Sequence, residues 1–147
     1  MSPQDRPKGE NRSAQHEGAS MTDLLAVHTS VSHTADATRL SEEALHRGLA
    51  ACVQLTMIES RYIWKNALVH ESEIDLMFKT TVAHYDALSA LIRSLHPYEL
   101  PSLYALPVSH ADAEYAAWVA RQADGSLRPL ITTAPGGEGG GGGMAGG

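Results

Sequence analysis

The sequence contains a single cysteine, which excludes both an internal disulfide and a zinc site built from several cysteines. Basic residues are also few. Eleven of them against 17 acidic residues give a net charge of −6, whereas a nucleic-acid-binding protein needs a basic face to offset phosphate charge. No apolar run approaches the ~18 residues of a membrane-spanning helix. The chain is nevertheless 43% hydrophobic, so we expect a packed domain that binds neither nucleic acid nor a membrane.

Composition divides the 147 residues into a central part and two ends. Residues 1–20 are polar and hold no apolar run for a signal peptide, and residues 125–147 hold most of the glycines. We predict a disordered leader at 1–20, one domain at 21–124 and a disordered glycine-rich tail at 125–147. Met21 is an alternative start to Met1. Charges cancel within each end, so the acidic domain carries the net charge, and its lone thiol suggests the cytoplasm.

The first part of the domain reads as a strand followed by a helix. Residues 24–29 form a short apolar run that is typical of a buried strand. Ser32 or Thr34 can cap a helix that continues to about Arg47, with apolar residues at helical spacing. Gly48 follows, where a helix end often needs a left-handed residue.

The next segment alternates apolar and polar residues and predicts a β-hairpin. One strand covers residues 52–64, a turn covers 65–68, and Ile74, Leu76 and Phe78 mark the returning strand. The apolar phase of the first strand shifts between Met57 and Glu59. We therefore predict a β-bulge there, which would restore a common inward face.

A second amphipathic helix is predicted after the hairpin. Thr80 or Thr81 can cap it, and apolar residues recur at helical spacing as far as Leu95. The helix must stop at His96, because Pro97 disfavours the helical conformation of the residue before it.

A last strand and helix complete the predicted order. Residues 103–106 read as a short strand, and Ser109 with Asp112 resembles a capping box before a helix that runs to about Val119. The order β-α-β-β-α-β-α is that of an α+β ferredoxin-like fold with a four-stranded antiparallel sheet. The hairpin strands exceed the usual length of about six residues, so we expect their free edges to pair with another copy.

Several short motifs resemble the CutA divalent-cation tolerance family. They occur in the family's order and spacing over most of residues 24–121. The two most specific are the LAAC and HPYxxP segments, taken together. The matching segments are LAAC at 49–52, YIW at 62–64, KTT at 79–81, HPYELP at 96–101, and LPV at 106–108 followed by Tyr115 and Trp118.

The resemblance implies a ferredoxin-like fold that assembles into a homotrimer by strand pairing, with the architecture of trimeric PII signalling proteins. It also implies a role in the response to divalent metal ions, copper above all. The expected cofactor is a divalent metal that the fold does not require. The alternative function is a PII-like signalling module that senses a small molecule in clefts between subunits.

Three residues are candidate metal ligands. The Cys52 thiolate would be a soft ligand that suits copper, although a free cysteine at a strand start is equally typical of a small buried residue. His96, fixed before a proline, can present its imidazole to a metal or can hydrogen-bond the end of its helix. Glu99 can add an oxygen ligand or remain a solvated loop acid. The other histidines are scattered, so a complete site would need residues from several subunits.

The likeness to trimeric PII proteins that the resemblance implies suggests a ligand cleft, whereas catalytic motifs are missing. Tyr62, Trp64, Lys79 and Trp118 can line a cleft between subunits or pack in the core or an interface. The sequence has no phosphate-binding glycine loop, nucleophile elbow or His-Glu-x-x-His motif. We therefore expect a metal-binding protein and not an enzyme.

Overall fold

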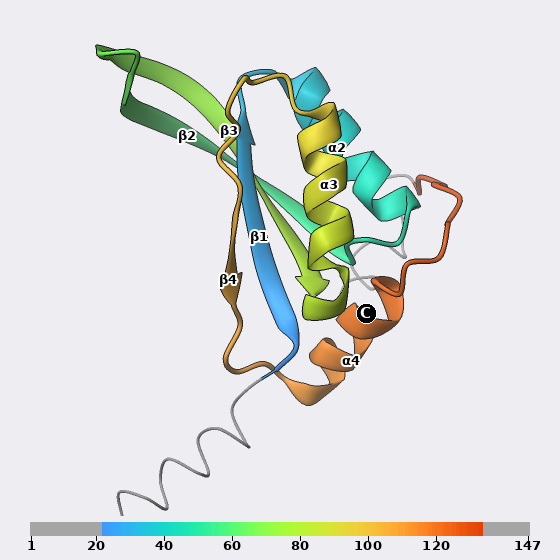
Figure 1. The fold of residues 1–147 in the computed structure, drawn as a ribbon. Coiled ribbons are helices and arrows are strands. Elements are labelled where there is room, and N and C mark those ends of the chain that lie inside the picture. Colours follow the sequence, from blue (N-terminus) through green and yellow to red (C-terminus); the bar gives the residue numbers. More distant parts are fainter. Residues whose placement is uncertain (1–21, 134–147) are drawn as a thin grey trace, which may run out of the picture.

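The computed structural model describes residues 22–133, so the predicted leader and residues 134–147 of the predicted tail lie outside the described residues. The order of elements follows the predicted β-α-β-β-α-β-α pattern (Figure 1). The elements are β1 (Leu24–Val31), α2 (Thr34–His46), β2 (Cys52–Trp64), β3 (Ala67–Thr81), a 3₁₀ turn (Val82–His84), α3 (Tyr85–Leu95), β4 (Tyr104–Pro107) and α4 (Ala113–Gln122).

The four strands form one antiparallel sheet in the order β2-β3-β1-β4. Helices α2 and α3 lie side by side along one face of this sheet, and α4 packs near the end where β1 begins (Figure 1). This is the ferredoxin-like α+β fold that the sequence predicts. The two outer strands, β2 and β4, each leave one edge without a strand partner in the described part of the chain.

The core lies between the sheet and the helices α2 and α3. Alternate residues of each strand point to the same face, so one set faces the helices and is buried. The predicted alternation in β3 is confirmed. Full burial of a large aliphatic or aromatic side chain contributes about 1.5–3 kcal/mol. The largest fully buried hydrophobic side chains are Val27, Val31, Leu40, Leu76, Phe78, Leu88 and Ile92, with Val119 from α4.

The long hairpin has no bulge, so that prediction is wrong. Pairing runs without an inserted residue from Cys52 opposite Lys79 to Trp64 opposite Ala67. The connection is a two-residue turn in which Lys65 and Asn66 have φ values of 51° and 69°. Positive φ at both positions is the geometry of the tight hairpin turn that follows strand twist. The phase shift in the sequence has a different cause: apolar side chains occupy both faces of β2 where no helix covers it.

Two of the predicted helix caps are also wrong. The residue before α2 is His33, and its side chain makes no capping hydrogen bond. The Ser32 hydroxyl bonds instead to the Tyr98 hydroxyl, 66 residues along the chain. Thr80 and Thr81 belong to β3 and are buried, so they do not cap α3. A tertiary contact therefore takes the Ser32 hydroxyl, whereas the Thr81 hydroxyl contacts the nearby His84 ring at 3.2 Å and the buried Thr80 hydroxyl has no partner among the described residues.

The end of α3 and the start of α4 are set by single residues. Helix α3 ends before His96, whose ψ of 136° is extended, as predicted for a residue that precedes proline. Helix α4 is capped by Asp112, whose Oδ2 accepts a hydrogen bond of 3.0 Å from the Tyr115 amide. The predicted cap, Ser109, lies outside the helix and bonds to His110.

The chain after α4 folds back onto the C-terminal end of α2. The Gly125 amide donates to the Gly48 carbonyl at 2.9 Å, and the Arg128 amide donates to the His46 carbonyl at 2.7 Å. The Arg128 guanidinium donates to two carbonyls at the end of α4, those of Arg121 and Gln122. Hydrogen bonds to the domain therefore continue four residues beyond the predicted boundary at 124.

Candidate functional site

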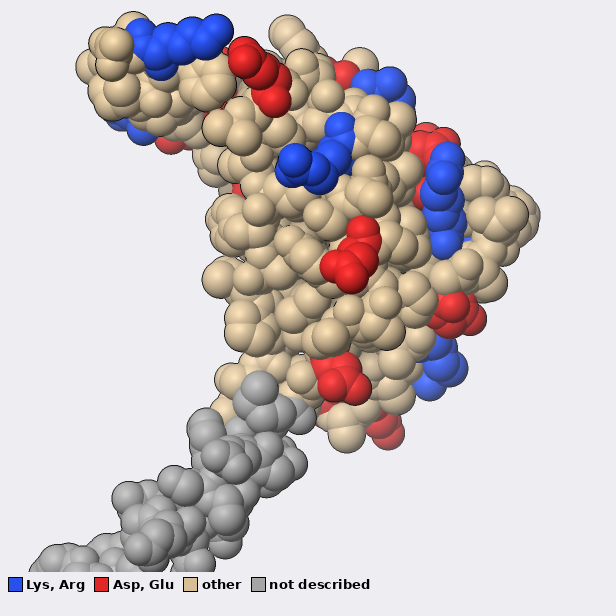
Figure 2. Space-filling view, in the orientation of Figure 1, with Lys and Arg blue, Asp and Glu red and all other residues tan. Residues whose placement is uncertain are grey.

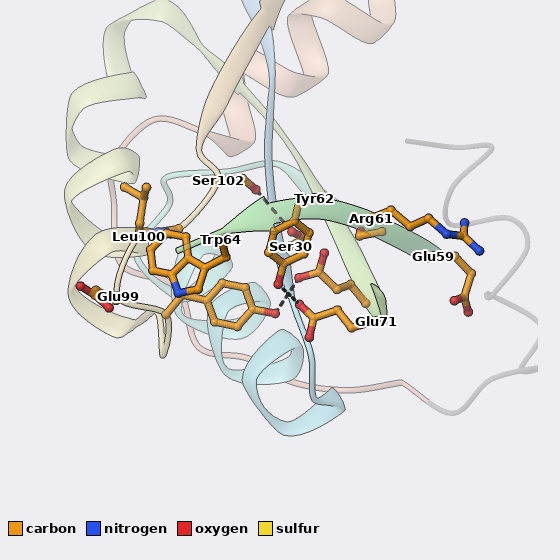
Figure 3. A pocket seen from close by; sticks show the side chains of 13 residues that line it. Ser30, Glu59, Arg61, Tyr62, Trp64, Glu71, Glu99, Leu100 and Ser102 are labelled. Atoms are coloured by element: carbon orange, nitrogen blue, oxygen red, sulfur yellow. Dashed lines mark hydrogen bonds between the residues drawn. The ribbon is translucent and has the colours of Figure 1, made fainter. Parts of the chain in front are cut away.

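An open cavity of about 940 Å³ lies between the hairpin and the loop that joins α3 to β4. The hairpin contributes residues 59–62, 64, 71 and 73, the loop contributes 98–102, and Ser30 comes from β1. Figure 3 shows Tyr62 and Trp64 extending from the hairpin among these residues. Carboxylates and aromatic rings dominate the lining, so the cavity is acidic but not polar throughout.

The most buried carboxylate that lines the cavity belongs to Glu73, which is only 5% exposed. The Tyr98 hydroxyl donates to Glu73 Oε2 at 2.6 Å, and the Ser32 hydroxyl lies 2.6 Å from the same Tyr98 oxygen. Burial and the bond to Glu73 raise the pKa of Tyr98 far above its usual value, so Tyr98 remains a donor. The three side chains fix the loop to β3 and to the start of α2.

Two further acid–aromatic contacts line the outer part of the cavity. The Tyr62 hydroxyl donates to Glu71 Oε2 at 2.7 Å, and this bond raises the pKa of Tyr62 to about 12. Lys65 Nζ lies 5.6 Å from the centroid of the Trp64 ring and 3.6 Å from Glu99 Oε1. The turn lysine therefore already places an ammonium group against a tryptophan in this region.

His96 uses both ring nitrogens to hold the loop. The Tyr98 amide donates to Nδ1 at 3.1 Å, so in the neutral ring Nε2 carries the proton and donates to the Ser30 carbonyl at 3.0 Å. Burial lowers the pKa of His96 below its usual value. A metal ion at either nitrogen would replace one of these hydrogen bonds.

Lowering the pH should destabilise the fold because the half-buried His96 ring resists protonation. Because its pKa is lower in the folded state, the unfolded chain takes up this proton first, and stability falls as pH drops below about 6.5. We expect the free energy of unfolding, from urea titrations at about pH 7.5 and pH 5.5, to fall less in His96→Gln than in the parent protein. The exposed His33→Gln variant should keep the parental pH dependence. Equal pH dependence in all three proteins would contradict the assignment.

The three predicted metal ligands do not meet within one chain. His96 contacts Ser30, whereas Cys52 pairs with Lys79, which lies opposite Ala26. Ser30 and Ala26 are four residues apart on β1, which is about 13 Å at the spacing of a strand. Glu99 pairs with Lys65, which belongs to the hairpin turn. Within residues 22–133 no group of three or more His, Cys, Asp or Glu side chains is arranged to hold a metal ion.

The predicted cleft residues separate into two places. Tyr62 and Trp64 line the cavity, but Lys79 lies at the other end of β3, with Nζ 5.4 Å from the centroid of the Tyr115 ring. Tyr115 stacks on Trp118. Sequence reasoning missed Glu71 and Glu73. Their signal was two acids two residues apart, directly before the apolar alternation of β3.

Charge on the displayed face of the molecule is mixed in sign. Figure 2 shows acidic and basic side chains interspersed on the face displayed, without a continuous basic area there. Among the described helices, none is long and apolar enough to cross a membrane.

Comparison with known proteins assigns the family. Residues 25–122 match the model for the CutA1 divalent ion tolerance protein. A divalent-cation tolerance protein CutA from Escherichia coli O45:K1 (strain S88 / ExPEC) is 38% identical over 104 residues, which cover 70% of this chain and 93% of that protein. The structure of CutA from Synechococcus elongatus PCC7942 matches with a TM-score of 0.67 and 38% identity, over 70% of this chain and 93% of that one.

A more distant structure shows the fold alone. It is described as the periplasmic divalent cation tolerance protein CutA from Archaeoglobus fulgidus and has a TM-score of 0.67 at 21% identity, covering 68% of this chain and 98% of that one. The family match, by contrast, includes all the described strands and helices apart from Leu24, the first residue of β1. The chain therefore belongs to the CutA1 divalent ion tolerance family.

Proposed function

We propose that this protein binds divalent metal ions, copper most tightly, and acts in the cytoplasmic response to them. The observation that carries the proposal is the family match over residues 25–122, a family described by divalent ion tolerance and not by a reaction. Copper heads the affinity order of divalent first-row metals for most ligand sets. The free thiol of Cys52 supports a reducing compartment such as the cytoplasm.

The proposed assembly is a homotrimer joined through the sheet edges. Large apolar side chains on the two edge strands support it: Met57 on β2 is 75% exposed, and Tyr104 and Leu106 on β4 are 50% and 51% exposed. Unpaired strand edges that carry apolar side chains favour pairing with another copy.

We place the metal ligands at Cys52, His96 and Glu99, with each site completed by a neighbouring copy. The neighbouring copy is needed because the three residues lie apart within one chain, so one chain supplies too few ligands at any one point. Three-fold symmetry would repeat each ligand and would gather the acidic charge of three domains, which raises the local cation concentration.

The test is a calorimetric titration of the full chain, without a tag, with Cu(II), Zn(II) and Mg(II). We expect Cu(II) to bind most tightly, and Cys52→Ser and His96→Ala each to weaken it by about tenfold or more. His33→Ala, at an exposed histidine, should leave the affinity unchanged. The proposal fails if no metal binds, or if a nucleotide binds and Cu(II) does not. Unaltered Cu(II) affinity in both ligand variants would remove these residues from the site.

A further inference from the structure

Glu73 is a nearly buried carboxylate without a basic partner among residues 22–133. Its hydrogen bond from Tyr98 engages Oε2 alone, and none of the ion pairs in this part of the chain includes it. A carboxylate has about four acceptor positions, and burying its charge is costly unless a cation compensates it. Because Glu73 also lines the cavity, a cation bound in the cavity would supply the missing partner.

Aromatic rings form the rest of the binding surface. Tyr62 and Trp64 reach the cavity from the hairpin (Figure 3), and Tyr98 lines it from the loop after α3. The face of an aromatic ring attracts an ammonium group, and Lys65 already uses the Trp64 ring in this way. Rings also pack against alkyl chains, so the wall suits a ligand that carries both ammonium groups and methylenes.

A bare metal ion fits this cavity poorly. The space of about 940 Å³ is far larger than an ion, and no cluster of three metal-ligating side chains occurs within residues 22–133. Glu71 and Glu73 point to the same side of β3 and stand two residues apart, about 7 Å along the strand. That spacing suits two ammonium groups joined by a short alkyl chain.

We propose that the cavity binds an aliphatic diamine or polyamine. One ammonium group pairs with Glu73 at the buried end, the second pairs with Glu71, and the methylenes between them lie against Tyr62 and Trp64. Arg61 also lines the cavity, and its positive charge repels an ammonium group, so we expect the amine to enter from the side of the loop and not past Arg61. Diamine binding here involves none of the proposed metal ligands except Glu99 at the rim.

Calorimetry on the full chain tests the proposal at about 0.15 M salt, where non-specific attraction to an acidic protein is screened. The probe is 1,4-diaminobutane, and the matched neutral probe is 1,4-butanediol. We expect the diamine to bind at one site per chain and the diol not to bind. Glu73→Gln, which keeps the shape and removes the charge, should weaken diamine binding by at least about tenfold. Glu42→Gln, at an exposed carboxylate of α2 outside the cavity, should match the parent.

A second variant keeps the test decisive if Glu73→Gln fails to fold. Trp64 lies at the hairpin end outside the buried core, so Trp64→Leu should fold and still weaken the diamine several-fold. In a Trp118→Phe background, the remaining tryptophan fluorescence should change on adding diamine, because Trp64 lines the cavity. Absence of diamine binding, equal binding of the diol, or an unchanged affinity in both cavity variants would overturn the proposal. None of these results bears on the Cu(II) titration, so the two proposals fail separately.

Discussion

Replacing Gly48 by alanine should destabilise the fold by about 2–4 kcal/mol. Gly48 has a φ of +66°, which costs an alanine roughly 1–2 kcal/mol. A Cβ atom there would also lie 2.3 Å from the Ser126 carbonyl oxygen and 2.7 Å from its amide nitrogen. Both are backbone atoms, so the returning chain after α4 would have to move and would lose its hydrogen bonds to α2. Urea unfolding of the parent and variant measures the loss.

Two comparison variants separate backbone strain from steric conflict at Gly48. Gly125 has a φ of +84°, but a Cβ there would meet only the His84 side chain, at 3.0 Å, which can shift. Gly125→Ala should therefore cost only the backbone strain, about 1–2 kcal/mol. Gly48→Asn tolerates the left-handed conformation but still carries a Cβ, so it should cost nearly as much as Gly48→Ala. A Gly48→Ala loss no larger than that of Gly125→Ala would show that the returning chain is not held firmly.

The fold was predictable wherever a local pattern decides the structure. The alternation of Ile74, Leu76 and Phe78 gave the strand and its buried face, and Pro97 gave the end of α3. The errors arose where distant residues take over a local role. A bulge in β2 follows only if both apolar phases of the strand face one core, but the hairpin extends past the helices and exposes apolar residues on both faces.

The candidate site was predictable only in part. Tyr62 and Trp64 belong to the YIW motif of the predicted hairpin, and the likeness to PII proteins that the family resemblance implies predicts a cleft there. Glu73 depends on Tyr98, 25 residues further along, and this contact forms only when the loop after α3 folds back onto β3. The two ring bonds of His96 arise from the same loop, and no sequence pattern reveals that its imidazole already has partners.

Replacing Phe78 by alanine should cost about 3–5 kcal/mol of folding free energy, the largest single loss we expect. Phe78 is fully buried on β3, between its pairing partners Val27 on β1 and Val53 on β2. The removed ring would leave a cavity under the helices that rigid strands on both sides cannot close. The lost free energy of burying the ring and the cost of the empty cavity therefore add. Thermal unfolding by circular dichroism and urea titration both report the loss.

Met77 provides the matched control for Phe78 because it is the preceding residue of the same strand and faces the opposite side of the sheet. It is half-buried in a single chain, so Met77→Ala should cost clearly less than Phe78→Ala. The comparison also tests the proposed trimer, because subunits that cover the second face of the sheet would bury Met77 further. A Met77→Ala loss that grows with protein concentration would indicate such burial, since the stability of an oligomer depends on subunit concentration. If Met77→Ala and Phe78→Ala lowered the free energy of unfolding equally at every protein concentration, the helix-facing side of β3 would not be the main core.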